Sequence, residues 1–445
     1  MEGTPRPQTV STKQKRIAEL AKQMPGTALT SLSHHMDLDW LREAHARTRK
    51  DGATGVDDQT AAEFSENLEV NLQALLDGAK SGTYRAPPVR REHIPKGDGS
   101  KTRPIGIPTY ADKVLQRAVA MLLEPIYEQD FYDFSYGFRP GRSPHDALEV
   151  LDKQLANGNG AWILEVDIKG FFDNLDHAKL RELLCQRVTD GVAVRLIGKW
   201  LNAGVFEGGV VSHPTSGTPQ GGVISPLLAN IYLHEAVDKW WVNDVLPRLR
   251  GRAAMIRYAD DFVMVFSSRE DALRVQAVLP KRVARFGLTL HPEKTRLIDY
   301  RRPGGGDGGH PGSFDFLGFT HHWGRTRTGA SAPMRKTSKS RFSRALRALN
   351  VWMARVRHRT VAEQVEILRS KLRGHFRYYG LRGNSDAIRR FRYEAVRLWK
   401  KWLSRRSQRA RLNWDAFARL MRRHPLPPAR LNPRGRQLLL PYANP

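Results

Sequence analysis

The stretch AWILEVDIKGFFD, residues 161–173, decides the fold of this chain together with MIRYADDFVMVF, residues 255–266. Apolar and polar residues alternate in the first stretch, which predicts a strand that ends at an acidic residue, Asp167. In the second stretch, two strand-like runs flank Asp260 and Asp261. A tight hairpin turn favours Asn-Gly or Asp-Gly and gains nothing from two adjacent carboxylates, which repel each other. A divalent cation would reverse this repulsion, and Mg²⁺ is the usual choice for one or two carboxylates plus phosphate oxygens.

The two acidic segments lie far apart in the sequence. Asp167 and Asp260 are separated by 93 residues, so only a fold that pairs their strands brings them together. Such a site suits two-metal phosphoryl transfer, in which one ion lowers the pKa of an attacking 3′-hydroxyl and the other neutralises a leaving pyrophosphate. A solvated turn is the ordinary interpretation of an acidic pair, but a strand-borne Asp167 and the apolar runs around the pair favour a metal site.

The positive charge of the chain is concentrated near one end. The formal net charge is +28, yet residues 1–320 carry 41 Lys and Arg against 40 Asp and Glu. Residues 321–445 carry 32 against 5. A solvated basic surface is the alternative interpretation, but so uneven a distribution favours a polyanion, and nucleic acid in particular.

Length and composition exclude several classes of protein. A chain of 445 residues is longer than one ordinary core requires, which favours two or three domains. The single cysteine, Cys185, excludes a disulfide framework and a cysteine-cluster zinc site. No run approaches the ~18 apolar residues of a membrane span, and the first residues lack the apolar core of a secretory signal. We therefore expect a soluble protein with no membrane partner.

Local patterns predict the other elements. Proline-punctuated extended runs over residues 84–108 predict a basic β-hairpin around Gly97-Asp98-Gly99. Helical spacing predicts a helix around 114–123, and strands alternate with helices between 161 and 300. The last quarter has a helical pattern, with one apolar stripe formed by Ile388, Phe391, Ala395, Leu398 and Trp402.

Taken together, the motifs resemble those of the group II intron reverse transcriptase/maturase family. The resemblance runs in family order from about Gly55 to about Pro428, and the segment GTPQGGVISPLLANIYL is highly specific to these polymerases. The matching segments are IPKGDGSKTRPIGIP (94–108), SYGFRPGRSPHDAL (135–148), DIKGFFDNLDH (167–177), GTPQGGVISPLLANIYL (217–233), RYADDFV (257–263), LTLHPEKT (288–295), FDFLGF (314–319) and LRGHFRYYG (372–380).

The resemblance implies an α+β fold, a right-hand polymerase with fingers and palm and a C-terminal all-helical basic thumb. Residues 1–35 are expected to form a flexible N-terminal arm. Residues 36–160 are expected to form an N-terminal extension and the fingers, 161–320 the palm with the catalytic carboxylates, and 321–445 the thumb or maturase domain that binds RNA.

For the catalytic centre, the resemblance implies that two Mg²⁺ ions, which Mn²⁺ could replace, are bound by Asp167, Asp260, Asp261 and the carbonyl of Ile168. Lys294 matches a lysine proposed to protonate the leaving pyrophosphate. A solvated lysine after a proline is the alternative interpretation of Lys294.

For the incoming nucleotide, the resemblance implies a second set of side chains. Phe172 matches the steric gate that excludes a ribose 2′-hydroxyl, whereas its neighbour Phe171 suits the core. Lys96 and Arg103 match finger residues that reach the triphosphate, and Lys101 is an alternative to Lys96. The Gln of the PQGG segment, Gln220, is expected to contact the nucleotide sugar.

The implied partners are structured intron RNA, an RNA template–DNA primer duplex, dNTPs and a DNA target. Such an enzyme is expected in the bacterial cytoplasm, associated with the nucleoid when it acts on DNA. Many relatives carry an appended endonuclease with cysteine and histidine pairs, and we expect that domain to be absent here. The residues expected to bind RNA are Arg373, Arg377, Arg389, Arg390, Arg397, Lys400 and Lys401.

Three other functions remain open on the sequence alone. A group II-like reverse transcriptase adopted by its host for phage defence or DNA repair would keep the same chemistry. A non-catalytic RNA-binding splicing factor would have lost its carboxylates, whereas Asp167, Asp260 and Asp261 are present. An RNA-templated RNA polymerase usually carries Gly before the paired aspartates and lacks an aromatic gate, so it fits less well.

Overall fold

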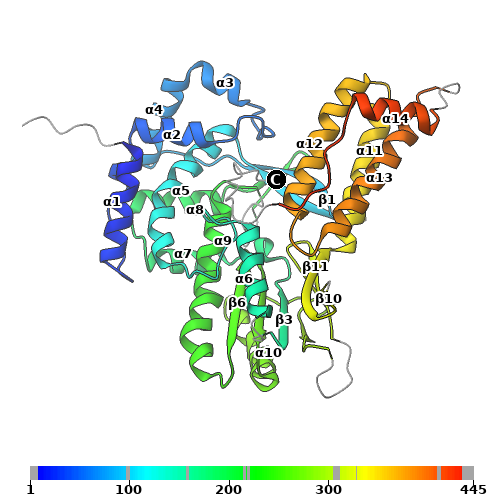
Figure 1. Ribbon diagram of the computed structural model, residues 1–445. Helices are drawn as coiled ribbons and strands as arrows, with labels where there is room; N and C mark the ends of the chain where they lie inside the picture. The colour runs from blue at the N-terminus through cyan, green and yellow to red at the C-terminus, as the bar shows by residue number, and fades with distance from the viewer. Residues whose placement is uncertain are drawn as a thin grey trace, which may run out of the picture. The chain divides into compact units, whose positions relative to one another are not determined.

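A computed structural model of the chain describes residues 9–96, 101–156, 160–213, 217, 221–303, 311–326, 328–407 and 412–432. The chain forms two compact units, Met1–Leu297 and Ile298–Pro445 (Figure 1). The predicted boundary at 320/321 is therefore displaced, because residues 298–320 belong to the second unit.

A four-stranded sheet in the first unit carries the acidic segments. Its order is β6-β7-β3-β8, and β7 pairs antiparallel with both β6 and β3. Residues Phe262–Phe266 of β7 are fully buried, as a central strand covered on both faces must be. Helices α6 and α10 pack against this sheet. The strands are β3 (Trp162–Asp167), β6 (Ala253–Tyr258), β7 (Asp261–Phe266) and β8 (Arg296–Asp299).

A second four-stranded sheet contains the predicted basic hairpin. Strands β1 (Val89–Lys96) and β2 (Lys101–Ile107) pair antiparallel, so the predicted strands are confirmed. The predicted turn lies outside the described residues. The sheet order is β2-β1-β4-β5, with β4 (Val205–Glu207) parallel to β1 and β5 (Val210–Ser212) at the edge.

Helices make up the rest of the first unit. Helix α5 is its central helix, because nearly all of its apolar residues from Val114 to Tyr127 are buried and it contacts α1, α2, α3, α4 and α9. The helices are α1 (Val10–Gln23), α2 (Leu38–Arg47), α3 (Ala61–Glu66), α4 (Leu68–Ser81), α5 (Tyr110–Asp130), α6 (Pro144–Ala156), α7 (His177–Cys185), α8 (Gly191–Leu201), α9 (Ser225–Leu233) and α10 (Arg269–Ala284). Short helical turns are η1 (Ser33–His35), η2 (Phe171–Asp173), η3 (His234–Asp238), η4 (Trp241–Val245) and η5 (Leu246–Arg248), of which η3 and η4 are π-helical.

Helix α1 contradicts the prediction of a flexible arm over residues 1–35. Ile17 and Ala21, one helical turn apart, are each only 1% exposed, and the helix packs against α5. The guanidinium of Arg187 donates to the carbonyl of Ala21 at 2.7 Å, which fastens the C-terminal end of the helix. A stripe of two apolar residues is too short to recognise in the sequence, and its main partners, α5 and Arg187, lie far along the chain.

In the part of the second unit that the structure describes, a small sheet is combined with four helices. Its strands are antiparallel in the order β11-β10-β9. They are β9 (Phe314–Phe316), β10 (Phe319–Arg325) and β11 (Ser331–Thr337), and the helices are α11 (Lys339–Val356), α12 (Val361–Tyr379), α13 (Ser385–Leu403) and α14 (Trp414–Arg423). The predicted apolar stripe of α13 is buried at Ile388, Phe391 and Ala395 and continues through Trp399 and Leu403.

An all-helical second domain over 321–445 is wrong at its beginning, where β10 and β11 lie. Their buried positions include polar residues, which conceals the alternation expected of strands. His321 and Arg335 are both buried, and the Arg335 guanidinium lies over the Phe319 ring, 6.0 Å from its centroid. Within the described part of the chain, no helix is long and apolar enough to cross a bilayer.

Candidate active site

Strand pairing brings the acidic segments to one end of the first unit's sheet. The antiparallel register of β3 and β7 places the Cα of Asp167 opposite that of Asp261. The register of β6 and β7 pairs Tyr258 with Asp261, so Ala259 and Asp260 form a two-residue turn. Asp167 and Asp260, 93 residues apart in the sequence, therefore lie at the same end of the sheet, as expected of a fold that pairs their strands. This end, formed by Asp167, Asp260 and Asp261, is called the acidic edge below.

The turn itself has an unusual backbone. Ala259 adopts φ +56°, a left-handed conformation that two-residue hairpins require and that glycine usually supplies. The loop at Gly137 lies directly against it, since a Cβ on Gly137 would be 2.3 Å from the Ala259 nitrogen. Strained backbone held by close packing is common at functional sites.

The electrostatic environment of the turn disfavours the negative charge of Asp260. Burial raises the pKa of the Asp260 carboxyl above its ordinary value, and the negative charge of Asp167 raises it further. The positive charges of Arg103 and Arg257 lower it. Because the negative charge of Asp167 disfavours that of Asp260, a divalent cation bound at this site would be stabilising.

The carboxylates can supply part of a metal shell. Among the described residues, no three acidic, histidine or cysteine side chains converge closely enough to hold an ion by themselves. Mg²⁺ is commonly bound by one or two carboxylates, with water and substrate phosphate oxygens as its other ligands. The residues present therefore fit a divalent cation that arrives with a nucleotide.

Lys294 lies beside the first carboxylate. Its Nζ is 2.8 Å from Oδ2 of Asp167, and the lysine side chain is half-exposed. The backbone nitrogen of His291 donates to the Asp167 carbonyl at 2.8 Å, and Ile168 forms a bridge with Leu290. The segment around Lys294 is thus fastened along the end of β3, which holds the ammonium next to the acidic edge.

Two adjacent phenylalanines differ in their burial, as expected. Phe171 is buried in the core, whereas Phe172 is half-buried, with its ring centroid 5.3 Å from that of Phe171. Both lie in η2, which is separated from the end of β3 by three residues. The ring of Phe172 packs against the core and stays partly exposed, whereas that of Phe171 is part of the core.

The predicted nucleotide-binding residues are only partly described. Arg103 is exposed on β2 and is close enough to Asp260 to influence its charge. The backbones of Lys96 and Lys101 form a cross-strand pair, while their side chains lie outside the described residues, as does Gln220. Gly221, which follows Gln220, lies against β2, since a Cβ there would be 2.5 Å from the Gly106 carbonyl oxygen.

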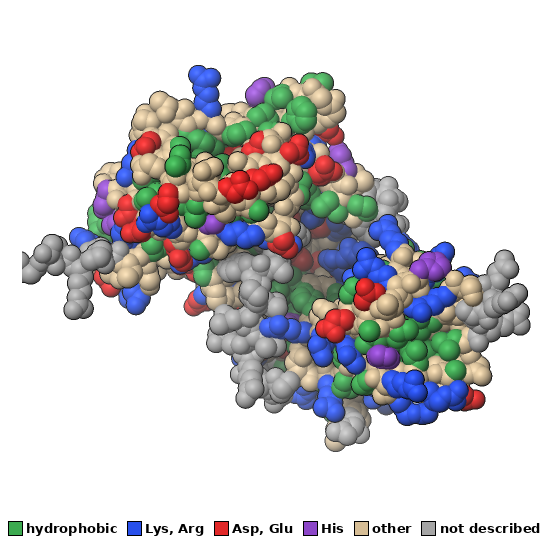
Figure 2. Space-filling view, turned by 90° about the horizontal axis from the view of Figure 1, so that it is seen from above, with side chains coloured by type: hydrophobic (Ala, Val, Ile, Leu, Met, Phe, Trp, Pro, Cys, Tyr) green, Lys and Arg blue, Asp and Glu red, His purple; other side chains and the backbone are tan. Residues whose placement is uncertain are grey.

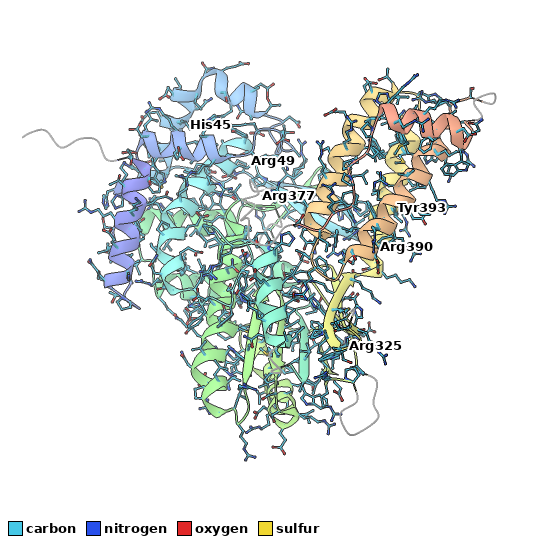
Figure 3. All side chains as sticks on the ribbon, in the orientation of Figure 1. His45, Arg49, Arg325, Arg377, Arg390 and Tyr393 are labelled. Atoms are coloured by element: carbon cyan, nitrogen blue, oxygen red, sulfur yellow. The ribbon has the colours of Figure 1, made fainter. Side chains whose placement is uncertain are left out.

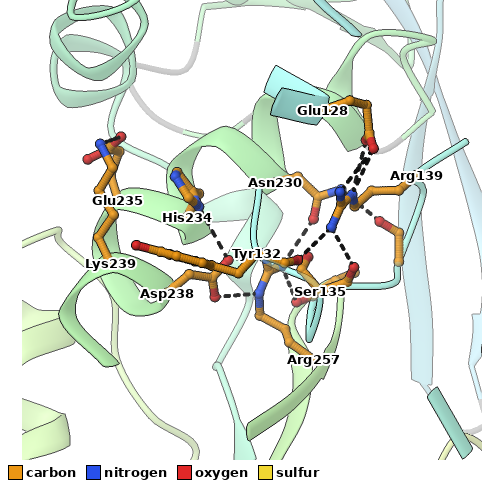
Figure 4. Close-up of polar contacts among 12 residues, drawn as sticks. Glu128, Tyr132, Ser135, Arg139, Asn230, His234, Glu235, Asp238, Lys239 and Arg257 are labelled. Carbon is orange, nitrogen blue, oxygen red and sulfur yellow. Dashed lines mark hydrogen bonds and ion pairs between the residues drawn. The ribbon is translucent and has the colours of Figure 1, made fainter. Parts of the chain in front are cut away.

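Sequence reasoning missed a buried polar network behind the turn. Arg257 and Asp238 are both fully buried and form an ion pair, drawn in Figure 4 with their neighbours. Asn230, also buried, contacts Arg257 and the carbonyl of Gly137. An arginine inside the otherwise apolar strand before the acidic turn was the one available signal, because a buried cation requires an anionic partner.

The second unit carries the predicted RNA-binding side chains on two helices. Arg373 and Arg377 are on α12, and the others are on α13, from which Arg390 and Tyr393 project in Figure 3. Figure 2 shows Lys and Arg gathered with few acidic side chains on its right-hand part, where the helices α11–α14 lie. The residues that are mainly exposed are Arg373, Arg389, Arg390, Arg397 and Lys401, while Arg377 and Lys400 are partly buried.

Comparisons with known proteins identify the family to which the chain is similar. Residues 94–321, about half of the chain, match the family model described as reverse transcriptase (RNA-dependent DNA polymerase). The chain is 33% identical over 389 residues to Protein YkfC of Escherichia coli (strain K12), covering 78% of this chain and 98% of YkfC. It is 41% identical over 230 residues to the group II intron-encoded protein LtrA of Lactococcus lactis subsp. cremoris, covering 51% of this chain and 37% of LtrA.

A more distant relative is Nuclear intron maturase 2, mitochondrial, of Arabidopsis thaliana, 25% identical over 237 residues that cover 44% of this chain and 30% of that protein. Paired carboxylates at the end of a mixed α/β unit and the family match together define the class: the chain is a reverse transcriptase, with the right-hand polymerase fold of that class. Within the class it belongs to the group II intron reverse transcriptase/maturase family. That family normally uses divalent metal ions and binds nucleic acid.

Proposed function

We propose that this chain copies RNA into DNA at the edge formed by Asp167, Asp260 and Asp261, and that its second unit binds a structured intron RNA. The observation that carries the catalytic part is the register of β3 and β7, which sets Asp167 opposite Asp261 with Asp260 in the adjoining turn. Two Mg²⁺ ions would be held by these carboxylates and the Ile168 carbonyl. Bound there, they would activate the primer 3′-hydroxyl and neutralise the pyrophosphate.

The protein's own side chains would orient the nucleotide and move protons. Arg103 offers a planar fork to triphosphate oxygens, with Lys96 or Lys101 beside it. Gln220 would contact the sugar, and Phe172 would exclude a ribose. Lys294, whose Nζ lies 2.8 Å from Oδ2 of Asp167, would give a proton to the leaving pyrophosphate.

The basic helices would act as an RNA clamp. Residues 321–445 carry 32 Lys and Arg against 5 Asp and Glu, and several of the exposed ones lie on α12 and α13. Structured RNA is recognised mainly through shape, phosphates and 2′-hydroxyls, which requires cations on a rigid surface. The helical unit would serve as thumb and maturase, holding the intron RNA in its splicing-competent fold and the template–primer duplex during synthesis.

Primer extension on an RNA template tests the proposed function. With a DNA primer and dNTPs, the full chain is expected to synthesise DNA in Mg²⁺ and to be inactive in EDTA. Ribonucleotides in place of dNTPs should give little product. Failure to extend the primer with either Mg²⁺ or Mn²⁺, by protein that binds the template–primer, would contradict the assignment.

Phe172 provides a prediction about sugar selectivity. Phe172→Ala is expected to increase incorporation of ribonucleotides relative to deoxynucleotides by about 10–100-fold, because a site that excludes a group by contact discriminates by ~1–3 kcal/mol. The ratio of kcat/KM for dATP and ATP measures it. Phe171→Leu, a change in the neighbouring core residue, should leave that ratio unchanged. Equal ratios for Phe172→Ala and the unaltered chain would remove Phe172 from the proposed gate.

A further inference from the structure

The catalytic turn is joined to a buried polar network by one side chain. Arg257 is the residue before Tyr258 at the end of β6, and it is fully buried. Its Nη1 donates to the Ala259 carbonyl, inside the turn, at 3.0 Å. Its Nε donates to Oδ1 of Asp238 at 2.8 Å, and its Nη2 donates to Oδ2 of the same carboxylate. The guanidinium therefore connects the turn directly to a buried anion.

A second connection reaches the other side of the turn. Nη1 of Arg257 also donates to Oδ1 of Asn230 at 3.0 Å, and Nδ2 of Asn230 donates to the Gly137 carbonyl at 2.7 Å. Gly137 is the residue whose backbone lies against the Ala259 nitrogen. Asn230 thus fixes the loop that packs on the turn, while Arg257 holds the turn's carbonyl.

The loop is also fastened to β6 through the backbone. The nitrogen of Arg257 donates to the Phe134 carbonyl at 2.9 Å, and the nitrogen of Tyr136 donates to the Arg257 carbonyl at 2.8 Å. Arg139 donates to the Ser135 carbonyl at 2.8 Å and forms an ion pair with Glu128. Figure 4 shows this loop and the two arginines in one polar cluster.

The anion of the network comes from an irregular helix. Asn230 is on α9, and Asp238 ends η3, the π-helical segment that continues it. Turns of π-helix are rare and frequently lie at functional sites. Within this segment His234 and Asp238 lie one turn apart, with His234 Nδ1 3.8 Å from Asp238 Oδ2. All three side chains are buried and face the same cluster.

We propose that Arg257, held by Asp238 and Asn230, is a positioning residue that fixes the Ala259–Asp260 turn so that the carboxylate of Asp260 meets the metal ion and the nucleotide at one defined point. This inference rests on the proposed polymerase function. It gives a function to the four hydrogen bonds that the Arg257 side chain donates, none of which involves the substrate. Metal sites commonly depend on such supporting contacts, whose loss costs activity or metal affinity.

Only arginine can make all of these bonds. The planar fork reaches both Asp238 oxygens, the Asn230 amide oxygen and the Ala259 carbonyl, whereas a lysine has one nitrogen with three donors. Arg257→Lys keeps the buried positive charge but cannot span these acceptors. The substitution therefore separates the charge of the residue from its geometry.

A second buried arginine provides a matched control. Arg187 forms an ion pair with Asp130 at 2.8 Å and donates to the carbonyls of Met24 and Ala21, on and after α1. It fastens a helix rather than the acidic turn. Arg187→Lys thus makes the same chemical change in a comparable buried pair and should lower the melting temperature without a specific effect on the active site.

The experiment compares the two lysine variants of the full chain. For Arg257→Lys, the single-turnover rate of the first dNTP addition to pre-bound template–primer is expected to fall about 10–100-fold, and the Mn²⁺ dissociation constant of the free protein, measured by electron paramagnetic resonance, to rise about 10-fold. Template–primer affinity should stay within about 2-fold. For Arg187→Lys, neither the rate nor the Mn²⁺ affinity should change by more than about 2-fold.

Asn230→Ala is the second variant, because it leaves the ion pair intact if Arg257→Lys fails to fold. It is expected to slow the same step about 10-fold. Its control is Asn71→Ala on α4. This change removes a side-chain amide whose Nδ2 donates to the Phe64 carbonyl at 2.8 Å, away from the acidic turn. Equal rates and equal Mn²⁺ affinities for each variant and its control would overturn the positioning role alone. An unaltered chain that adds no nucleotide would instead overturn the proposed function.

Discussion

Asp260→Asn is expected to reduce DNA synthesis on an RNA template by about 10³-fold or more, since a metal that activates the nucleophile and the leaving group contributes several kcal/mol. The amide has nearly the same shape as the carboxylate, so the turn between β6 and β7 should be retained. The measurement is the rate of primer extension with protein in excess over template–primer. Equilibrium binding of the same template–primer should remain within a few-fold of that of the unaltered chain.

The melting temperature of Asp260→Asn shows whether a loss of synthesis comes from the missing carboxylate or from unfolding of the protein. The pKa of Asp260 is raised by burial and by the charge of Asp167, so its ionised form is unfavourable in the metal-free fold. A neutral amide removes that repulsion, and the melting temperature in EDTA is expected to stay the same or to rise. Asp77→Asn, at an exposed site on α4, is the control. Synthesis within 10-fold of normal by Asp260→Asn would exclude Asp260 as a metal ligand.

The edge that carries the carboxylates was predictable because its determinants are local. Alternation in β3 and the apolar runs on both sides of Asp260 define three strands, and strands this apolar must be buried together. The register that sets Asp167 opposite Asp261 does not follow from this pattern alone, because residues Phe262–Phe266 of β7 are buried on both faces of the sheet. The difference in burial between Phe171 and Phe172 was expected from the resemblance to the family and not from the strand pattern.

The structural features that the sequence did not predict depend on contacts with residues elsewhere in the chain. Arg257 is a single polar residue in an apolar strand, and its significance appears only when Asp238, 19 residues earlier, reaches it from a π-helical turn. Helix α1 is stabilised by its contacts with α5 and Arg187, and the apolar pattern of its own sequence is weak. The early strands of the second unit bury His321 and Arg335, which a search for apolar alternation passes over. Long-range polar burial is therefore the common reason for the missed features.

The second large effect is expected on RNA binding. Neutralising four cations of α13 together, Arg389, Arg397, Lys400 and Lys401 to Gln, should reduce the slope of log affinity against log salt by about 3, because each lost phosphate contact removes ~0.7–0.9. Between ~0.15 M and 1 M salt this corresponds to a loss of about 10²–10³-fold in affinity at the lower salt. Filter binding or fluorescence anisotropy with a structured RNA over a range of salt concentrations measures both quantities.

Net charge alone would predict the same loss wherever four cations are removed. The control is a variant with four exposed cations of the first unit, Lys153, Arg248, Arg250 and Lys281, changed to Gln. Long-range attraction is screened over ~8 Å at physiological salt, so this control should lose no more than a few-fold. If the affinity and the slope of log affinity against log salt decrease equally in the two quadruple variants, the chain attracts RNA through its total charge. If only the α13 variant does so, phosphates contact that helix, because counterion release requires cations at the bound surface.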